Sequence, residues 1–440
     1  MRKLLQTLWL PLIFLILPLE VNAQNGWVAY SFPGGDAFHF ADDNNGLVTG
    51  KYIYSRTTNG GNTWSSDSVP YPHNFNYYNA VFFINANTGW LGMAYEVFNF
   101  PIGLTGGVTY KTTNGGVNWS QGENAGPVKD IQFLNENTGY VAAGGTNGFW
   151  TEGGIKKTTD GGMNWAGIYG GYYFVDVSFI NVNTGWAIGS YGDDIGTYIS
   201  LMLRTTSGGN SWTTLIRDSA IAFPVDPLKK IQFTNANTGY LLKNKLYKST
   251  NSGDNWSMLD TNVFAGRQLR KFYFINNDTG WVTATGTIFR TNNGGMNWTM
   301  QSIPTPDVTG DIYFTNTLTG WAIANGTTIL RTGTGGVTSI EPLSTEIPTE
   351  FSLHQNYPNP FNPTTKIKFD IPQTVRGEKS KVKLSVYDMS GKEIAELVNK
   401  ELQPGSYEYN FDGSGLPSGV YFYKLQSGSF IKTKRMVMVK

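Results

Sequence analysis

Few side chains in this chain could perform chemistry, and their types exclude several mechanisms. The 440 residues include no Cys and only three His, at positions 39, 73 and 354. Without thiols there is no disulfide framework, no thiolate metal site and no cysteine nucleophile. Three scattered histidines leave too little for a histidine metal site or a serine–histidine relay. We therefore expect no metal site, no cofactor and no catalytic residue of these kinds.

Carboxylates in loops are the remaining source of catalytic chemistry. A glycoside hydrolase needs two facing carboxyl groups, and Glu96, Glu152, Asp193 and Asp194 lie in predicted loops. Acidic side chains in loops are more often simply solvated. We therefore place an extracellular glycan hydrolase second, behind a protein that is not an enzyme.

The composition indicates what kind of scaffold must position such groups. The chain has 53 Gly, 14% aromatic and 15% charged residues, which is typical of an all-β protein rich in tight turns. With 33 basic and 32 acidic residues the net charge is +1, so no long-range field favours nucleic acid or an anionic membrane. A ligand must be bound by local features.

The N-terminus has the pattern of a secretory signal peptide. Arg2 and Lys3 precede an apolar stretch over residues 4–19, and the small residue Ala23 provides a cleavage site. We expect residues 1–23 to be removed. An uncleaved anchor is the alternative, but two prolines interrupt the short apolar run. No later segment is apolar enough to span a bilayer.

Two motifs alternate along the middle of the chain. Copies of Thr-Thr-Asn-Gly-Gly-x-x-Trp end at Trp64, Trp119, Trp165, Trp212, Trp256 and Trp298, and a seventh copy stops at Val337 before its Trp. Copies of Asn-x-Asn-Thr-Gly-Trp/Tyr end at Trp90, Tyr140, Trp186, Tyr240, Trp281 and Trp321, with a degenerate first copy at residues 43–47. Seven units of about 40 to 54 residues result. This period, with several short strands per unit, predicts a seven-bladed β-propeller.

Each unit begins with a short strand of period two. Its same-face pairs are Phe38/Phe40, Val81/Phe83, Ile131/Phe133, Val177/Phe179, Ile231/Phe233, Phe272/Phe274 and Ile312/Phe314. Such alternation predicts a half-buried strand. The Asn-Thr-Gly and Gly-Gly segments then form turns, and the Trp after Gly-Gly is expected to pack between blades.

The missing seventh Trp has a substitute at the start of the mature chain. Residues 25–30 contain Trp27 and read like the strand that the last repeat lacks. We predict that this segment completes the last blade beside residues 329–332, which would cover two open sheet edges. Trp27 thus joins Trp64, Trp119, Trp165, Trp212, Trp256 and Trp298 as a structural repeat residue.

The Gly-Gly-x-x-Trp repeats resemble the Asp-box, Ser-x-Asp-x-Gly-x-Thr-Trp, and residues 25–337 resemble seven-bladed propellers of the photosystem II assembly factor type. The resemblance implies the fold and says little about the ligand. We interpret the residues at the Asp position as turn caps: Asn59, Asn114, Asp160, Ser207, Asn251, Asn293 and Thr334. Sialidases of this kind clamp a carboxylate with three arginines, and the assembly factors have an arginine-lined surface. Within residues 25–337 of this chain the arginines outside the motifs are Arg217, Arg267 and Arg270.

The C-terminal quarter has a different composition. Residues 338–350 are rich in Pro, Ser, Thr and Glu and are expected to be a linker. Residues 351–440 contain about six short predicted strands, which favours a small Ig-like β-sandwich. Its segments 356–365, 387–391, 416–421 and 432–440 closely resemble the type A sorting domain of the type IX secretion system. The resemblance implies passage through the outer membrane by that machinery, removal of the domain, and surface attachment or release. An ordinary adhesion module is the alternative.

A ligand is expected on the propeller end opposite the two repeated turns. That end carries the strand 2–3 loops and the links between blades, which vary most among the repeats. Trp150 is the one Trp of the mature chain outside both motif registers, and an exposed Trp can stack on a sugar or anchor a peptide. The candidate residues are Trp150, Phe149, Tyr95, Tyr77, Tyr172 and Tyr191. The alternative is that Trp150 fills the core of its own loop.

These observations favour a secreted or cell-surface binding or scaffolding propeller that is not an enzyme. Its expected partners are the secretion machinery, through residues 351–440, and an extracellular glycan or protein. A glycan hydrolase and a structural surface component remain the alternatives.

Overall fold

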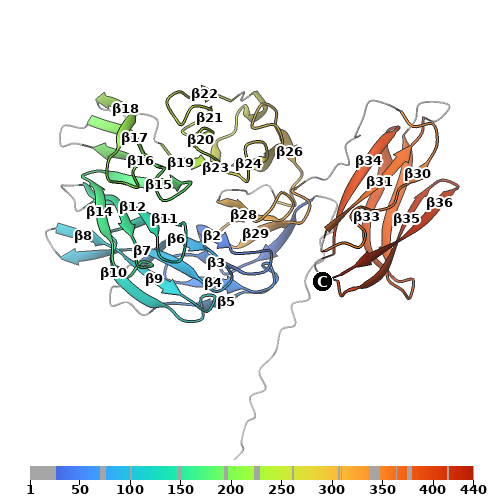
Figure 1. Cartoon of the computed structure of the whole chain (residues 1–440), viewed down its shortest axis with the longest axis horizontal. Helices are drawn as coiled ribbons and strands as arrows, with labels where there is room; N and C mark the ends of the chain where they lie inside the picture. The colour runs from blue at the N-terminus through green and yellow to red at the C-terminus, as the bar shows by residue number, and fades with distance from the viewer. Residues whose placement is uncertain are drawn as a thin grey trace, which may run out of the picture.

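The computed structural model describes residues 26–69, 76–99, 102–146, 151–192, 197–221, 228–259, 262–305, 308, 310–336, 347–362, 364–373, 379–413 and 416–439. Within them the regular structure is strand, apart from one short 3-10 helix, Asn262–Phe264. Figure 1 shows seven sheets around one centre and, beside them, two further sheets as a separate body. The predicted signal peptide and residues 338–346 of the predicted linker lie outside the described residues. No helix in the described part is long and apolar enough to cross a membrane.

Six blades are antiparallel sheets whose strands follow one another in the sequence. The first three blades are β2 (Ala37–Phe40), β3 (Gly46–Thr49), β4 (Tyr54–Thr57) and β5 (Ser65–Asp67); β6 (Asn76–Phe83), β7 (Gly89–Asn99), β9 (Val108–Thr112) and β10 (Ser120–Asn124), with β8 (Ile102–Gly106) paired to β7; and β11 (Val128–Phe133), β12 (Gly139–Thr146), β13 (Thr151–Thr158) and β14 (Ala166–Gly170). The next three are β15 (Tyr173–Phe179), β16 (Gly185–Gly192), β17 (Thr197–Thr205) and β18 (Thr213–Ile221); β19 (Lys230–Phe233), β20 (Gly239–Leu242), β21 (Leu246–Ser249) and β22 (Ser257–Met258); and β23 (Leu269–Phe274), β24 (Gly280–Ala284), β25 (Thr287–Thr291) and β26 (Thr299–Gln301).

The seventh blade joins the two ends of the propeller. It consists of β27 (Ile312–Phe314), β28 (Gly320–Asn325), β29 (Thr328–Thr332) and the N-terminal strand β1 (Val28–Ser31). β1 pairs antiparallel with β29, with Val28 opposite Arg331 and Ser31 opposite Thr328. The predicted closure is thus confirmed. Because β1 takes the outer position, the seventh blade also has four strands.

A stacked pair of aromatic rings joins most neighbouring blades. The Trp or Tyr that follows Asn-Thr-Gly lies flat on the Phe of the next blade's inner strand, as Trp186 does on Phe233 at 3.5 Å between ring centroids. The other stacked pairs are Trp90–Phe133, Tyr140–Phe179, Tyr240–Phe274, Trp281–Phe314 and Trp321–Phe40. In the remaining interface Leu47 takes the aromatic position and packs with Phe83. The turn glycine makes room for the Phe ring, since a Cβ on Gly89 would lie 2.5 Å from Phe83 Cδ1.

The Trp of the Gly-Gly motif, or Trp27 in the seventh blade, meets the same Phe edge-on. Six interfaces therefore hold a three-ring cluster, and the interface with Leu47 holds two rings, Phe83 and Trp119. Trp256 lies 6.0 Å from Phe233 at 80°, and Trp27 lies 5.9 Å from Phe314 at 84°. These Trp residues are half-buried, except Trp27, whereas the Trp and Tyr residues of the stacked pairs are fully buried. Both motifs therefore contribute aromatic rings to the blade interfaces. The rings of the Asn-Thr-Gly motif are the more deeply buried.

The polar side chains of the Gly-Gly motif cap their own turn, as predicted. Thr57 Oγ1 accepts hydrogen bonds from the backbone N–H groups of Asn59 and Gly61, and Asn59 Oδ1 accepts one from Thr63 N. In the strict copy Asp160 accepts from Asn164 N and Asn164 Nδ2, and these bonds hold the pKa of its carboxyl down at about 2. The motif is a structural turn.

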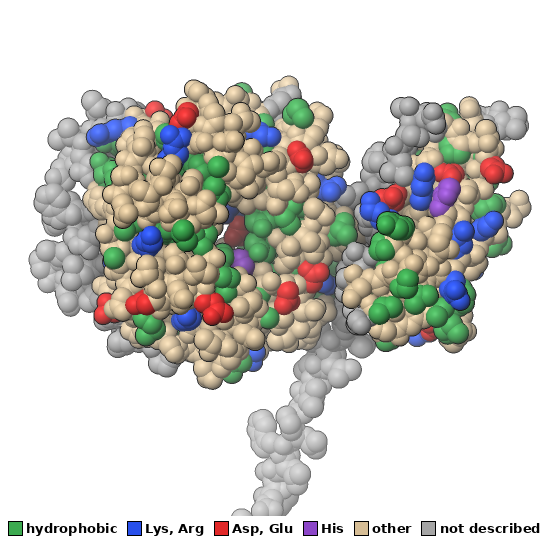
Figure 2. Space-filling model, viewed as in Figure 1, with side chains coloured by type: hydrophobic (Ala, Val, Ile, Leu, Met, Phe, Trp, Pro, Cys, Tyr) green, Lys and Arg blue, Asp and Glu red, His purple; other side chains and the backbone are tan. Residues whose placement is uncertain are grey.

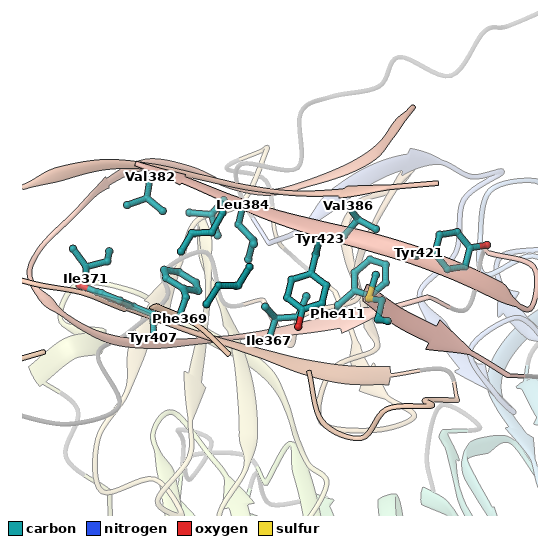
Figure 3. Packing of buried hydrophobic residues seen from close by; sticks show 14 of the residues in the cluster. Ile367, Phe369, Ile371, Val382, Leu384, Val386, Tyr407, Phe411, Tyr421 and Tyr423 are labelled. Carbon is teal, nitrogen blue, oxygen red and sulfur yellow. The ribbon is translucent and has the colours of Figure 1, made fainter. Parts of the chain in front are cut away.

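The C-terminal part is a two-sheet sandwich with its own core. One sheet has the order β30 (Ser352–Leu353), β31 (Thr364–Ile371) and β34 (Gly405–Asp412). The other has the order β33 (Glu393–Leu402), β32 (Ser380–Tyr387), β35 (Gly419–Ser427) and β36 (Phe430–Met438). Side chains from both sheets, including Phe369 and Tyr423, interdigitate between them (Figure 3). The six predicted strands are all present, and β30 was not predicted.

Candidate functional site

The end of the propeller with the repeated turns, here called the motif face, is occupied by structural hydrogen bonds. Asn85 Oδ1 accepts from the N–H groups of Asn87 and Thr88, and the same cap recurs in the other repeats, with Asp42 in the first. The basic residue before the Gly-Gly motif is also engaged in six of the seven repeats. Arg331 lies over the Trp321 ring at 5.7 Å and donates to the carbonyl of Asp43 in the first blade, and Arg204 pairs with Asp254 of the next blade at 2.8 Å. These side chains hold neighbouring blades together.

The opposite end, here called the loop face, is extended over three neighbouring blades. The β7–β8 hairpin of the second blade continues to the pair Asn99–Ile102, and the β12–β13 hairpin continues to Thr146–Thr151. The β16–β17 pairing reaches Gly192–Tyr198 in the fourth blade. β8 lies against β12. The hairpins therefore form an asymmetric wall on one side of the propeller. Most of the aromatic residues that the sequence suggests as ligand contacts belong to these hairpins in the sequence.

Tyr77, one of the predicted ligand residues, belongs to a small aromatic and cationic group. The Lys51 ammonium lies 5.3 Å from the Tyr77 ring and 5.2 Å from the Tyr52 ring. Tyr52 is 42% exposed and has a φ of 79°, a left-handed conformation that costs about 1–2 kcal/mol for an L residue. Tyr52 and Lys51 were not predicted, because Tyr and Lys in a loop give no periodic signal.

The other predicted residues have different surroundings. Tyr95 lies across the hairpin from Gly106, and its ring occupies the space that a side chain at Gly106 would need. Tyr172 packs with Tyr169 at 5.9 Å and Phe174 at 6.4 Å, against the core between the third and fourth blades. Tyr191 belongs to β16, but only its backbone is described. Phe149 and Trp150 lie outside the described residues. Of the six predicted residues, Tyr77, Tyr95 and Tyr172 have described side chains, and these three have different immediate neighbours.

A ring of seven side chains at the centre of the propeller, five of them charged, was not predicted from the sequence. The first strand of each repeat is the inner strand, and it starts at the loop face. The ring is formed by the residue directly before the first residue of the same-face apolar pair of that strand. In blade order these residues are Ala37, Ala80, Asp130, Asp176, Lys230, Lys271 and Asp311. We call this set the central ring. Figure 2 shows the central hollow, with acidic and His side chains at its wall. Aligning the repeats could have found it, because this position varies between Ala, Asp and Lys beside positions that hardly vary.

Side chains on the inner strands satisfy the backbone of the next blade. Asp130 Oδ2 accepts from Val177 N at 3.2 Å, and Asp176 Oδ2 accepts from the N–H of Ile231. Gln232 lies two residues after Lys230 on the same inner strand. It accepts a hydrogen bond from Phe274 N and donates one to Phe274 O, both at 2.8 Å. Inner strands have one unpaired edge, and these bonds stabilise the donors that would otherwise stay unpaired there.

Burial and neighbouring charges shift the pKa values of two residues of the central ring, Asp176 and Lys230. Burial raises the pKa of Asp176, and the neighbouring Asp130 adds to the effect, although Lys230 opposes it. Burial lowers the pKa of Lys230, but the carboxylates of Asp176, Asp311 and Asp130 outweigh it and raise the pKa overall. Among the described residues no carboxylate lies within ion-pair distance of the Lys230 or Lys271 ammonium. The ring thus presents both signs of charge to the central hollow.

His39 on the first inner strand predicts a pH dependence of stability. Its Nδ1 accepts a hydrogen bond from Phe83 N at 3.3 Å, and the rings of Phe82 and Tyr313 flank it. Burial lowers its pKa to about 3, so the folded protein binds this proton less readily than the unfolded chain. The contribution of neutral His39 to the free energy of unfolding is therefore fully present above pH ~6.5. It is lost as the pH falls below that value, by up to about 1.4 kcal/mol per pH unit.

A substitution isolates the contribution of His39. His39→Gln should flatten the pH dependence of the free energy of unfolding, because Gln132 and Gln232 already serve as the backbone cap at the equivalent position of other blades. Denaturant unfolding followed by Trp fluorescence between pH 4 and 7.5 measures this. Equal pH slopes for the wild type and the variant would contradict the assignment.

Comparisons with known proteins agree with this architecture. Residues 355–440 match the secretion system C-terminal sorting domain, and residues 171–303 match the photosynthesis system II assembly factor YCF48. No curated protein matches the chain. The solved structure of YCF48 bound to D1 peptide has 19% identity and a TM-score of 0.51, covering 70% of this chain and 96% of that one. YCF48 from Cyanidioschyzon merolae has 17% identity and a TM-score of 0.48, covering 70% and 98%.

A polysaccharide lyase, a PL25 ulvan lyase, has 8% identity and a TM-score of 0.42, covering 70% of this chain and 96% of that one. The fold and the sorting domain rest on the family matches and on the first YCF48 structure. The chain is a secreted or cell-surface protein, with a seven-bladed β-propeller of the Asp-box kind that resembles the photosystem II assembly factor and a C-terminal sorting domain for type IX secretion.

Proposed function

We propose that the propeller is a binding module that is not an enzyme, and that its ligand docks on the loop face. The observation that carries the proposal is the difference between the two ends of the propeller. On the motif face the repeated polar side chains are used in turn caps and contacts between blades. On the loop face the second, third and fourth blades extend their hairpins beyond what closing the propeller needs.

The loop face has three features that suit a ligand. The extended hairpins form a wall, the pair Tyr52 and Tyr77 presents aromatic rings around the Lys51 ammonium, and the central ring opens nearby. YCF48, whose fold this propeller shares, is known in a complex with a peptide. Aromatic rings and mixed charges serve both sugars and peptides, so the proposed ligand is an extracellular glycan or protein.

Trp150 is the sharpest test of this location. In the sequence it belongs to the β12–β13 connection, and it lies outside the described residues. Trp150→Ala should weaken binding at least tenfold, about 1.4 kcal/mol or more, and leave the unfolding midpoint unchanged. Binding titrations and thermal unfolding of the mature propeller measure the two effects.

Trp212→Ala is the matched control. Trp212 ends a Gly-Gly motif, and its ring centroid lies 6.2 Å from that of Phe179. Its loss should therefore lower stability without a specific effect on binding. If Trp150→Ala instead lowers the midpoint as much as Trp212→Ala does, Trp150 belongs to the core of its loop.

Screening the mature propeller against glycan and protein arrays identifies the ligand and separates the alternatives. Turnover of a polysaccharide that is abolished by Glu96→Gln or Glu152→Gln would make the protein a hydrolase. Self-association without binding to any glycan or protein would make it a structural surface component. Specific binding without turnover supports the proposal.

A further inference from the structure

The outer surface of the sorting domain contains a hollow that its core does not explain. Two adjoining depressions of about 340 and 330 Å³ lie on either side of the turn at residues 388–391, and they share Asp388 and Met389 as walls. Val420 lines one of them, and Phe422 and Lys424 line the other. We call this region the turn groove.

The outward side of the sheet forms the floor of the depression lined by Phe422 and Lys424, whereas the other depression also touches the core residue Tyr421. Along β35 the buried side chains are Tyr421, Tyr423 and Leu425, and the alternate residues Phe422 and Lys424 point away from the core. Phe422 stands opposite Tyr387 on one neighbouring strand and opposite Arg435 on the other. Aromatic and basic side chains are thus gathered on a surface that contributes nothing to the sandwich core.

The turn that divides the groove is rigid and holds an apolar side chain in solvent. Asp388 Oδ1 accepts from Ser390 N at 2.9 Å, Lys392 N at 3.0 Å and Ser390 Oγ at 2.6 Å. At the tip of this turn Met389 is 70% exposed. A large apolar side chain fixed in water by an ordered turn is typical of an interaction surface.

The electrostatics of the groove favour a partner that carries a carboxylate. The Lys424 ammonium lies 4.6 Å from the Tyr387 ring, and no ion pair is formed by Lys424 or Arg435 with any described residue. Of the two nearby acids, Glu393 is already bound by Lys383 at 3.1 Å and by the Tyr387 hydroxyl at 3.0 Å. Asp388, a wall of both depressions, has its Oδ1 engaged by donors of its own turn. The groove therefore combines apolar side chains with two cations, Lys424 and Arg435, that form no ion pair with a described residue.

The walls of the groove come from three of the segments by which the sequence resembles a sorting domain. The turn belongs to segment 387–391, Val420 to segment 416–421, and Thr433 to segment 432–440. These segments are far apart in the sequence, and the fold brings them to one surface. Core packing alone would not place the outward-facing members of all three at one hollow.

We propose that the turn groove is the surface through which the export machinery recognises the sorting domain. The partner is a protein component of that machinery that presents an apolar side chain beside a carboxylate, which contacts Lys424 and Arg435 while Met389 and Phe422 are covered. The inference rests on the sorting function of residues 355–440.

The test is export of the full-length protein in a host that has type IX secretion. Met389→Glu and Lys424→Glu should each lower the amount at the surface and in the medium at least tenfold, with accumulation in the periplasm. Met389→Ser, which removes the apolar side chain without adding charge, should give a smaller loss in the same direction. Thermal unfolding of each purified precursor checks that the sorting domain is still folded.

Ile431→Glu is the matched control, because Ile431 is 59% exposed at the far end of β36, beyond the groove. It should be exported like the wild type. Wild-type export of folded Met389→Glu and Lys424→Glu, or an equal loss for Ile431→Glu, would overturn the groove assignment. A fusion of the signal peptide, an unrelated domain and residues 338–440 tests sorting itself: if that fusion stays in the periplasm, the sorting function fails rather than the groove.

Discussion

Deletion of residues 24–31 from the mature propeller is expected to lower the free energy of unfolding by several kcal/mol. The deletion removes β1, which pairs with β29 and provides the fourth strand of the seventh blade. It also removes Trp27, which is 1% exposed and packs against Phe314. Loss of a buried Trp alone costs about 3–5 kcal/mol, and the newly open edge of β29 would invite aggregation. Denaturant unfolding and light scattering measure both consequences.

Trp27→Ala separates the side chain from the strand. It should retain the β1 pairing and lose only the buried ring, so its midpoint should lie between those of the wild type and the deletion. If the deletion leaves the melting temperature unchanged, β1 is dispensable and closure by this strand is wrong.

Trp186→Ala is expected to have the largest effect of any single substitution in the propeller, about 3–5 kcal/mol. Trp186 is fully buried, lies flat on Phe233 of the next blade at 3.5 Å, and donates from Nε1 to the carbonyl of Ser252 at 2.9 Å. Its removal would open a cavity between two blades and leave that carbonyl without this donor. The free energy of unfolding from denaturant titration measures the loss.

The protein contains its own control for this position. Leu47 occupies the same place in the first repeat and packs with Phe83. Trp186→Leu should therefore keep much of the buried apolar area and cost clearly less than Trp186→Ala. Equal losses for the two variants would mean that the Ser252 hydrogen bond, and not the stacked ring, dominates the interface.

The architecture could be predicted because the same physical solution is repeated. Each inner strand buries the same pair of apolar residues, as with Ile231 and Phe233, and each pair precedes the same capped turn. Seven aligned copies reinforce a pattern that is weak in any one of them. The role of Trp27 followed because the last copy was visibly incomplete. The extra strand β8 was not predicted, since only the second unit has it.

The candidate site was much less predictable, for the opposite reason. Loop residues such as Tyr52 and Lys51 follow no period, and their contacts depend on how neighbouring blades approach. Tyr172 illustrates the limit: its place in a variable segment gives no sign that its ring packs against Tyr169 and Phe174. Asp176 and Lys230 belong to regular strands, but only assembly of the propeller brings their charges into one central ring.

The seventh blade, which combines strands from both ends of the propeller, also imposes an order on folding. Its outer strand begins at Val28, five residues after the predicted cleavage site at Ala23, while its partner strand β29 ends at Thr332. Some three hundred residues must be synthesised and arranged before the first strand of the mature chain meets its partner, so closure is a late and slow step of folding. The propeller is therefore completed only after the chain has been translated through its seventh repeat.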